Sequence, residues 1–401
     1  MFLYDHRSVR RSVAEEQLYA LPLNRKSDVM NSTKLLQLAK STLIYTLLSY
    51  ALATVCYADQ ATVTALYETP QVISEDDAAD DPAIWINYAA PEQSLVFGTD
   101  KQSGVYSYKL NGEQIGYSEL GRINNIDSRT LTPGDRATDT DSQTFVFASN
   151  RTLQTVDLWV LSDSALAEAA ASERFALPIT RSVQAQSGIN IYGICAGVDK
   201  DLGLIAFATE DEGPRVELWQ YRDESLRLLM TFNNGGESEG CVYDDENRTL
   251  LISEEEVGGV LRAYQVSDQL DFSSPIIVDS REGHIKGDPE GVAIYKTSDT
   301  DGYVLLSSQG DSKFNVYDRQ SPYTYRGSFN IVDGAVIDGQ LVDGTTITDG
   351  IAVANYPFNS DFPKGLFVAQ DNDNIIEPAG KPRRQNFKLV SFADIIDALE
   401  L

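Results

Sequence analysis

Residues 95–108 read LVFGTDKQSGVYSY, an apolar strand followed by a polar turn and a second strand rich in tyrosine. Similar units recur along the chain, and six copies begin at Leu95, Phe145, Leu204, Leu250, Val304 and Leu366. The first and last starts are 271 residues apart over five intervals, a mean repeat of about 54 residues, which suits four-stranded propeller blades. The sequence therefore predicts an all-β fold, a six-bladed β-propeller.

Helical patterning is confined to two short segments, residues 165–171 and 393–399, and turn signals such as Asn111-Gly112 separate the other segments. The six units follow one another without a linker, which favours one closed ring. A β-sandwich and a two-domain β protein are the alternative architectures.

The first 58 residues differ from the rest of the chain. After Met30, a basic start with Lys34 and Lys40 precedes an apolar run that ends near Val55, and small residues follow up to Ala58. This order is typical of a secretory signal peptide, and the run is short for a membrane span. We expect residues 1–58 to form a leader with Met30 as its true start. The mature domain would comprise residues 59–401, outside the cytoplasm.

Charge and composition exclude several classes of protein. Acidic residues outnumber basic residues by 60 to 32, and the formal net charge is −28. Such a chain repels nucleic acid and anionic membranes, so neither is an expected partner. Because it attracts divalent cations, an anionic substrate would need metal ions that reverse the local field.

Histidine and cysteine chemistry is also restricted. The only histidines are His6 and His284, which excludes phosphatase sites built on several histidines or on an Arg-His-Gly signature. Neither Cys195 nor Cys241 starts a Cys-x₅-Arg phosphate loop, and no CxxC pair suggests structural zinc. These two cysteines could pair outside the cell or could be buried free thiols.

The repeats place particular side chains at equivalent positions. The residues two past each apolar run are Asp100, Asn150, Glu210, Glu254, Gln309 and Asp371, and the next residues are Lys101, Arg151, Asp211, Glu255, Gly310 and Asn372. Symmetry puts such positions in a ring around one end of the central channel. Cations and carboxylates in this ring predict a functional surface, because any polar residue would serve in a plain hairpin.

A second acidic feature precedes the first repeat. Residues 77–85 read DAADDPAIW, with three carboxylates before Pro82. The proline stiffens the backbone and biases Asp81 towards an extended conformation, so we expect the acids on a rigid corner leading into a strand. Clustered carboxylates of this kind suit Ca²⁺, which prefers six to eight oxygen ligands. A solvated acidic loop is the alternative interpretation.

The chain resembles the β-propeller phytases from Glu68 to Phe392. Motifs that carry the resemblance include DAADDPAIW at 77–85, NNID at 124–127, SNR at 149–151, IYG at 191–193, ESEG at 237–240, SEEE at 253–256, GDPEGVAIY at 287–295, SSQG at 307–310, TDGIAV at 348–353, GLFVAQD at 365–371 and QNFK at 385–388. The resemblance implies a secreted six-bladed propeller that removes phosphate from phytate, inositol hexakisphosphate, using several bound Ca²⁺ ions. The enzyme that the resemblance implies is a phosphoric monoester hydrolase of the 3-phytase type.

The resemblance also implies site residues. Phosphate-binding cations fall on Lys101 and Arg151, and with Glu239 and Glu255 these are the predicted catalytic residues. Arg215 is a further substrate-binding candidate. The predicted metal ligands, to which the acidic stretch adds Asp81, are Glu68, Asp80, Asp81, Tyr192, Glu212, Glu239, Glu255, Asp288, Glu290, Gln309 and Asp349.

Two departures from the family pattern concern substrate phosphate binding. Gln102 and Asp211 stand where the family often has lysines, and Arg215, four residues after Asp211, is a candidate to restore one charge. With no usable histidine or cysteine nucleophile, metal-activated water is the simplest mechanism left. We expect a monomer that takes phytate as its calcium complex. The alternatives are a calcium-dependent propeller lactonase or esterase and a non-catalytic calcium-binding propeller.

Overall fold

The computed structural model describes residues 61–131, 142–171, 176–334, 336–337, 340–375 and 384–401. The predicted leader, residues 1–58 with Met30, lies outside the described residues. None of the described helices is long and apolar enough to cross a membrane.

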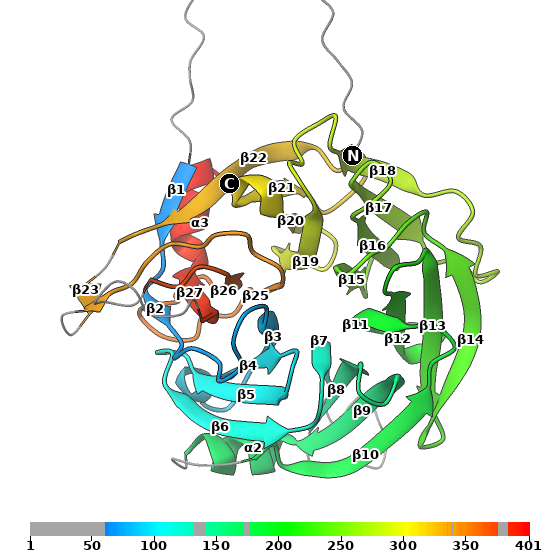
Figure 1. The fold of residues 1–401 in the computed structure, drawn as a ribbon, viewed down its shortest axis with the longest axis horizontal. Coiled ribbons are helices and arrows are strands. Elements are labelled where there is room, and N and C mark those ends of the chain that lie inside the picture. Colours follow the sequence, from blue (N-terminus) through cyan, green and yellow to red (C-terminus); the bar gives the residue numbers. More distant parts are fainter. Residues whose placement is uncertain (1–60, 132–141, 172–175, 335, 338–339, 376–383) are drawn as a thin grey trace, which may run out of the picture. The chain divides into compact units, whose positions relative to one another are not determined.

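Six blades of four antiparallel strands are arranged around a central channel, as Figure 1 shows, and the prediction of a six-bladed β-propeller is confirmed. The strand nearest the channel is β3, β7, β11, β15, β19 or β25 in the successive blades. In blade 1 the strands are β3 (Ala79–Trp85), β4 (Leu95–Asp100), β5 (Gly104–Lys109) and β6 (Gln114–Glu119). Blade 2 contains β7 (Ile123–Leu131), β8 (Gln143–Asn150), β9 (Thr155–Ser162) and β10 (Ile179–Gln186).

Blade 3 contains β11 (Ile191–Asp199), β12 (Gly203–Glu210), β13 (Arg215–Arg222) and β14 (Ser225–Asn233). Blade 4 contains β15 (Cys241–Asp244), β16 (Thr249–Glu254), β17 (Val260–Gln265) and β18 (Ile276–Ser280). Blade 5 contains β19 (Pro289–Lys296), β20 (Gly302–Ser308), β21 (Lys313–Asp318) and β22 (Tyr325–Val332). Blade 6 contains β25 (Ile351–Ala354), β26 (Leu366–Asp371) and β27 (Asn386–Ser391), with β2 (Tyr67–Glu68) as its outer strand.

The predicted repeat starts all fall at the second strands of the blades, β4, β8, β12, β16, β20 and β26. Both predicted helices are also present, as α2 (Asp163–Ala170) and α3 (Phe392–Leu399). Two 3₁₀ turns, η1 (Pro91–Gln93) and η2 (Gln309–Asp311), and the small hairpin β23 (Val336–Ile337) with β24 (Gln340–Leu341) complete the described elements.

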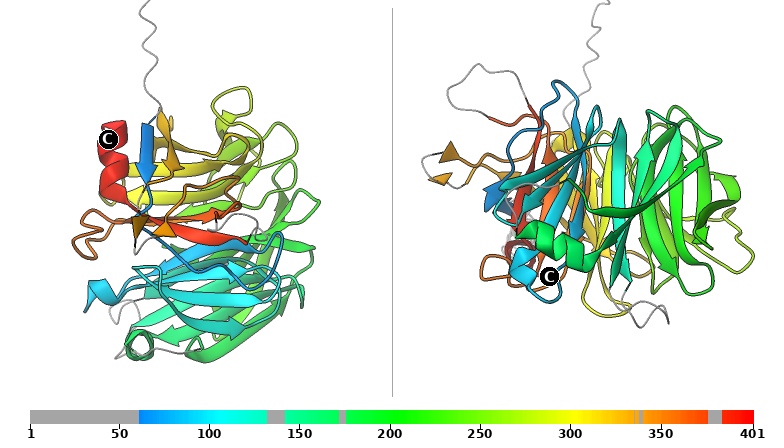
Figure 2. Two further views of the ribbon diagram at one scale, coloured as in Figure 1. Left: turned by 60° about the vertical axis from the view of Figure 1, so that its left-hand side comes forward. Right: turned by 90° about the horizontal axis from the view of Figure 1, so that it is seen from below.

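Segments from the two ends of the domain close the ring. Strand β2 pairs with β27, so that Tyr67 lies opposite Leu389 and Glu68 opposite Lys388. Strand β1 (Ala61–Thr64) adds to blade 5 as a parallel neighbour of β22, beside helix α3 (Figure 2). Sequence-distant pairing of this kind removes a free edge from the ring.

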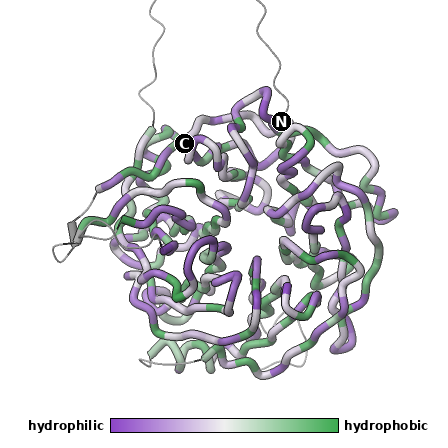
Figure 3. Tube along the Cα trace, viewed as in Figure 1, coloured by the Kyte–Doolittle hydropathy of each residue, from purple (hydrophilic) through white to green (hydrophobic). Residues whose placement is uncertain are grey.

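The core consists of apolar layers between neighbouring blades. Side chains alternate along each strand, so a blade with two buried faces packs against both of its neighbours. On β4, for example, Leu95 and Phe97 belong to the layer against blade 2, whereas Val96 belongs to the layer against blade 6. In Figure 3, hydrophilic segments reach the centre of the ring. Polar residues are therefore found beside the channel, whereas the apolar layers lie between the blades.

Irregular pairing turns residues of the inner strands towards the channel. The register between inner and second strands shifts between Ala79 and Pro82 in blade 1, and similar shifts follow Ile123, Ile191 and Pro289. Such β-bulges re-aim side chains near the ends of strands. Asp80 and Asp81 therefore lie within β3 at a bulge, and the prediction that they precede the strand on a corner is corrected in this respect.

Candidate active site

The central ring is the set of six residues, one from each blade, that lie second in the inner strand or two residues before its start. Its members are Asp80, Asn124, Tyr192, Glu239, Glu290 and Asp349. Hydroxyl groups on the second strands fix the neighbouring backbone. Thr99 Oγ1 accepts from the amide of Asp81, and Thr209 Oγ1 accepts from that of Gly193, both at 2.9 Å. The bulges and these bonds together direct the ring side chains inwards.

Glycine follows the ring residue where backbones of adjacent blades meet. A Cβ atom at Gly193 would lie 1.9 Å from the carbonyl oxygen of Glu239, and one at Gly240 would lie 2.1 Å from that of Glu290. No side chain fits in that space. The glycines of the IYG and ESEG motifs therefore permit a close approach of adjacent blades, beside Tyr192, Glu239 and Glu290.

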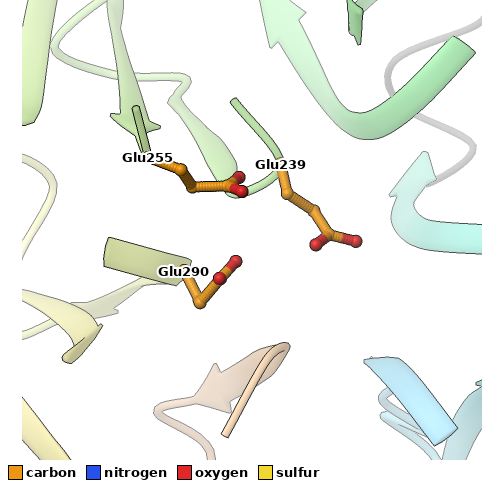
Figure 4. Close-up of side chains that lie close together, drawn as sticks. All are labelled: Glu239, Glu255 and Glu290. Carbon is orange, nitrogen blue, oxygen red and sulfur yellow. The ribbon is translucent and has the colours of Figure 1, made fainter. Parts of the chain in front are cut away.

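Three glutamates form what we call the carboxylate cluster: Glu239, Glu255 and Glu290 (Figure 4). One carboxylate oxygen from each lies within 4.8 Å of the others. Glu255 Oε1 and Glu290 Oε2 are buried and accept no hydrogen bond from the described residues. Within the part of the chain that the structure describes, none of the three carboxylates forms an ion pair. The cluster therefore crowds three carboxyl groups that no ion pair among the described residues compensates.

This arrangement changes the protonation of the acids. Burial raises the pKa of Glu239 to about 8, although the charge of Lys101 opposes the shift, and the charges of Glu290 and Asp349 add to it. Burial, with the charge of Glu239, raises the pKa of Glu255 to about 9. The pKa values of Asp80, Glu290 and Asp349 are also raised, first by burial and then by nearby acids. A cation between these groups would favour their ionised forms.

Lys101 lies beside the acids of the central ring. Its ammonium donates to Asp80 Oδ1 at 3.1 Å and to Asp349 Oδ2 at 3.4 Å, and it lies 2.8 Å from the exposed Asp77. Burial alone would lower the pKa of Lys101, but the charges of Asp80 and Asp349 outweigh it and raise the pKa. The ammonium is therefore permanently charged and fixed at the edge of the ring.

Arg151 lies on the other side of Asn124. Its guanidinium donates to Asn124 Oδ1 at 3.0 Å and to Asp211 Oδ2 at 2.8 Å, and it stacks over the ring of Tyr192 at 5.2 Å. The Asn124 amide in turn donates to Asp80 Oδ2 at 3.0 Å and to Glu239. Asp80 and Asn124 thus connect both predicted phosphate-binding cations to the same group of acids.

Other predicted ligands also lie at this end of the channel. Gln309 donates to Asp349 Oδ1 at 2.9 Å and to Glu290 Oε1 at 3.3 Å. Burial raises the pKa of the Tyr192 phenol, and the charges of Glu239, Glu255 and Glu290 raise it further. Asp81 accepts the amide of Ile126 at 3.0 Å and lines a channel cavity of about 340 Å³.

Four predicted residues have other surroundings in the structure. Asp288 pairs with Arg281, and Glu212 is exposed in a turn with a positive φ of 55°. Glu68 pairs with the buried Lys388, and Arg215 engages Glu210 through its Nε at 3.0 and 2.8 Å. The contacts of Glu68 and Arg215 do not include any member of the central ring. Their roles in metal and substrate binding remain predictions.

Neither the role of Asn124 nor the contact between Arg151 and Asp211 was predicted from the sequence. Asn124 is fully buried and bonds to both an acid and an arginine of the site. The NNID motif was visible, and Asn124 is the second residue of β7, as Asp80 is the second residue of β3. A comparison of the residues at the starts of the predicted inner strands would have identified Asn124.

The question left open for the cysteines is answered by the structure. Cys195 and Cys241 form a disulfide whose Cα atoms are 5.6 Å apart. It joins β11 of blade 3 to β15 of blade 4.

The fold and the site define a six-bladed β-propeller with a candidate metal centre at its channel mouth. The family model described as Phytase matches residues 31–401. A curated relative, the 3-phytase of Bacillus subtilis (strain 168), is 31% identical over 345 residues, which cover 84% of this chain and 85% of the relative. The chain therefore belongs to the phytase family.

A solved structure shares the fold alone. A mutant α-L-arabinofuranosidase of Fusarium graminearum, in complex with an iminosugar inhibitor, matches with a TM-score of 0.50 and 10% identity, over 83% of this chain and 99% of that one. At this identity the likeness concerns architecture only.

The residues present fit a hard divalent cation. Oxygens that bind one Ca²⁺ lie about 2.3–2.6 Å from it, so oxygens within 4.8 Å of one another can share an ion. A bound cation would supply a partner for the two buried oxygens, Glu255 Oε1 and Glu290 Oε2, that accept no hydrogen bond from the described residues. Glu239, Glu255 and Glu290 are thus the residues best placed to hold a metal.

Proposed function

We propose that this protein is a secreted, calcium-dependent phosphomonoesterase that hydrolyses phytate. Family membership supports a phytase activity, and the name of the Bacillus relative makes the 3-phosphate a candidate for attack. The observation that carries the proposal is the chain of bonds from Lys101 through Asp80 and Asn124 to Arg151, with Glu239 attached to Asn124. This chain of bonds places the side chains of Lys101 and Arg151 beside the carboxylate cluster.

In this proposal the residues divide the work. Lys101 and Arg151 bind phosphate oxygens, and the planar guanidinium can offer two parallel donors. Asp80, Asn124 and Tyr192 hold these cations in place. Glu239, Glu255 and Glu290 hold calcium, with Gln309 and Asp349 beside them. When bound, calcium would neutralise substrate charge and make a nearby water a better nucleophile.

The acidic surroundings of Arg151 bear on the form of the substrate. Asp211 already neutralises part of this arginine at 2.8 Å, where the family often has a lysine. Free phytate is highly anionic and would be repelled by such a rim, whereas its calcium complex carries less charge. We therefore propose that the calcium complex binds. We also propose that the protein is a monomer.

Export of the chain is a separate part of the proposal. A disulfide persists in oxidising compartments, and its presence supports a location outside the cytoplasm. N-terminal sequencing of the exported protein should start near Asp59. An active mature protein that retains residues 1–58 would contradict this processing.

Two variants of Arg151 test the phosphate site. Arg151→Ala should lower the rate of phosphate release from phytate about tenfold to a hundredfold, the effect of losing a charged hydrogen bond of about 1.5–3 kcal/mol. Arg151→Lys restores the charge but not the two-pronged geometry, so it should recover the rate only in part.

Arg326→Ala is the matched control, because Arg326 forms one ion pair, with Asp318, on the outer part of blade 5. Melting temperatures of all variants separate folding from activity. If Arg151→Ala keeps the parent rate per folded molecule, the assigned phosphate site is wrong. Failure of the parent protein to release phosphate from phytate, while it hydrolyses a lactone or simple ester, would overturn the function itself.

A further inference from the structure

The Cys195–Cys241 disulfide lies close in sequence to two members of the central ring. Cys195 is three residues after Tyr192 on β11, and Cys241 is two residues after Glu239 at the start of β15. Each cysteine is also held by its own blade, because Cys195 lies opposite Phe207 on β12 and Cys241 opposite Ile252 on β16. The bond therefore connects two blades beside the candidate metal centre.

Hydrogen-bonded sheet does not connect these blades. Strands β11 and β15 belong to separate four-stranded sheets, so side-chain packing and a few contacts hold them together near the channel. One such contact is the close approach of Gly193 to the carbonyl oxygen of Glu239. A small separation of the blades at this point would move Glu239 away from Tyr192.

Electrostatic repulsion favours such a separation when no cation is bound. Glu239 belongs to blade 4 and lies within 4.8 Å of the carboxylate of Glu290 from blade 5. Its other neighbours include Asp80 from blade 1, through Asn124. These carboxylates must be ionised to bind the metal, and ionised carboxylates at these distances repel one another. A covalent link opposes any relaxation that moves Glu239 outwards.

We propose that the Cys195–Cys241 disulfide is a positioning element of the cation site. It holds Tyr192 and Glu239 in the arrangement that binds the metal, so that the free protein is organised for binding before the ion arrives. Binding to a preorganised site avoids the cost of ordering it. The proposal rests on the proposed binding of calcium by Glu239, Glu255 and Glu290.

Calcium titration by isothermal calorimetry tests the proposal without relying on activity. The double variant Cys195→Ala/Cys241→Ala should bind Ca²⁺ about tenfold more weakly than the parent, within the usual range of coupling between a conformational constraint and a ligand. Its thermal stability should also fall. Phosphate release from phytate should then require more calcium but reach a similar maximum.

The control must lose stability without touching the site. Val316→Ala removes a fully buried side chain from β21, in the layer between blades 5 and 6. It should lower the melting temperature yet leave calcium affinity within about twofold of the parent. If the double variant also stays within twofold, the disulfide only stabilises the fold and the proposal is overturned. A parent that binds no calcium would instead refute the proposed function.

Two further measurements cover a double variant that does not fold. Cys195→Val/Cys241→Ala refills the buried volume at position 195 and is titrated in the same way. The parent can also be reduced with dithiothreitol, whose two thiols become a cyclic disulfide while the two protein sulfurs take up two electrons and two protons. Free thiols are counted before titration. Parent-like calcium affinity in the folded protein with both thiols free would overturn the proposal.

Discussion

Two buried groups of acids in this molecule differ in how their charge is balanced. In the Lys388 cluster, Lys388 pairs with Glu68 and Asp343, lies 3.5 Å from Asp371 Oδ2 and donates to Asn374 Oδ1 at 3.0 Å. The carboxylate cluster of Glu239, Glu255 and Glu290 has no such partner among the described residues. One group contains its own cation, and the other presents buried oxygens to the channel.

The pKa values of the two groups express this difference. Burial raises the pKa of Asp371 only to about 6, because the charge of Lys388 opposes the shift. In the carboxylate cluster burial raises the pKa of Glu239 to about 8 and that of Glu255 to about 9. A fixed ammonium suits a structural joint between β2 and β27. An exchangeable cation suits a site at which substrate must also bind.

The largest expected effect comes from removing the internal cation. Lys388→Met leaves three acids buried without their partner, and breaking a buried ion pair costs about 3–5 kcal/mol. Urea unfolding should show this loss. The control Lys313→Met removes a partly exposed lysine, 3.1 Å from Asp311, and should cost less than about 1 kcal/mol. Equal losses for the two variants would show that Lys388 is not essential to ring closure.

Removing calcium should have the next largest effect. Ligand that binds only the folded state stabilises it by about 2.7 kcal/mol at a hundredfold excess over the dissociation constant. Melting curves in excess chelator should therefore shift to lower temperature and recover when Ca²⁺ is added back. An unchanged melting temperature would mean that the carboxylate cluster holds no stabilising ion.

The pH dependence of stability distinguishes the two groups more finely. Since the pKa values of Glu239 and Glu255 are raised from 4.5 to about 8 and 9, the folded calcium-free protein binds more protons than the unfolded chain in this window. Its free energy of unfolding should fall as pH rises from about 5 to 9. The pKa of Asp371 is raised only to about 6, so the part of this fall that is due to Asp371 should end near pH 6.

Calcium should flatten this dependence, because an ion takes the place of the protons. Thermal unfolding at several pH values, with chelator and with Ca²⁺, measures both curves. Glu255→Gln should also reduce the slope in chelator. A slope that calcium does not change would contradict the assignment of the titrating groups to the cation site.

The smallest effect is expected for Arg215→Ala. This side chain is 48% exposed, is engaged by Glu210 and does not contact the central ring, so we expect it to lie outside the phosphate site. Phosphate release from phytate should change by less than about twofold, as is usual for exposed ion pairs. A loss comparable to that of Arg151→Ala would instead establish Arg215 as the replacement for the missing lysine.

Much of the fold was predictable because repetition makes local patterns reinforce one another. Lys101 and Arg151 follow the second strands of successive blades, and their equivalence followed from the repeat alone. The bulges at Ala79–Pro82 and Ile123–Ile126 were not predictable, because they depend on cross-strand register.

Contacts between distant segments account for what the sequence did not reveal. The pairing of Glu68 with Lys388 spans 320 positions and exists only because the ring closes there. Asn124 was missed because a neutral amide carries no charge signal, although its neighbours make it the connection between Asp80 and Arg151. Spacing alone also could not show whether Cys195 and Cys241 meet.

The most direct test of the account is phosphate release from phytate as Ca²⁺ is titrated into metal-free protein. We predict almost no release at first and a saturable rise as calcium binds. In a parallel titration, Glu239→Gln should need much more calcium or stay inactive. Full activity of the metal-free protein in excess chelator would contradict the central claim, that uncompensated carboxylates at the channel mouth work through a bound cation.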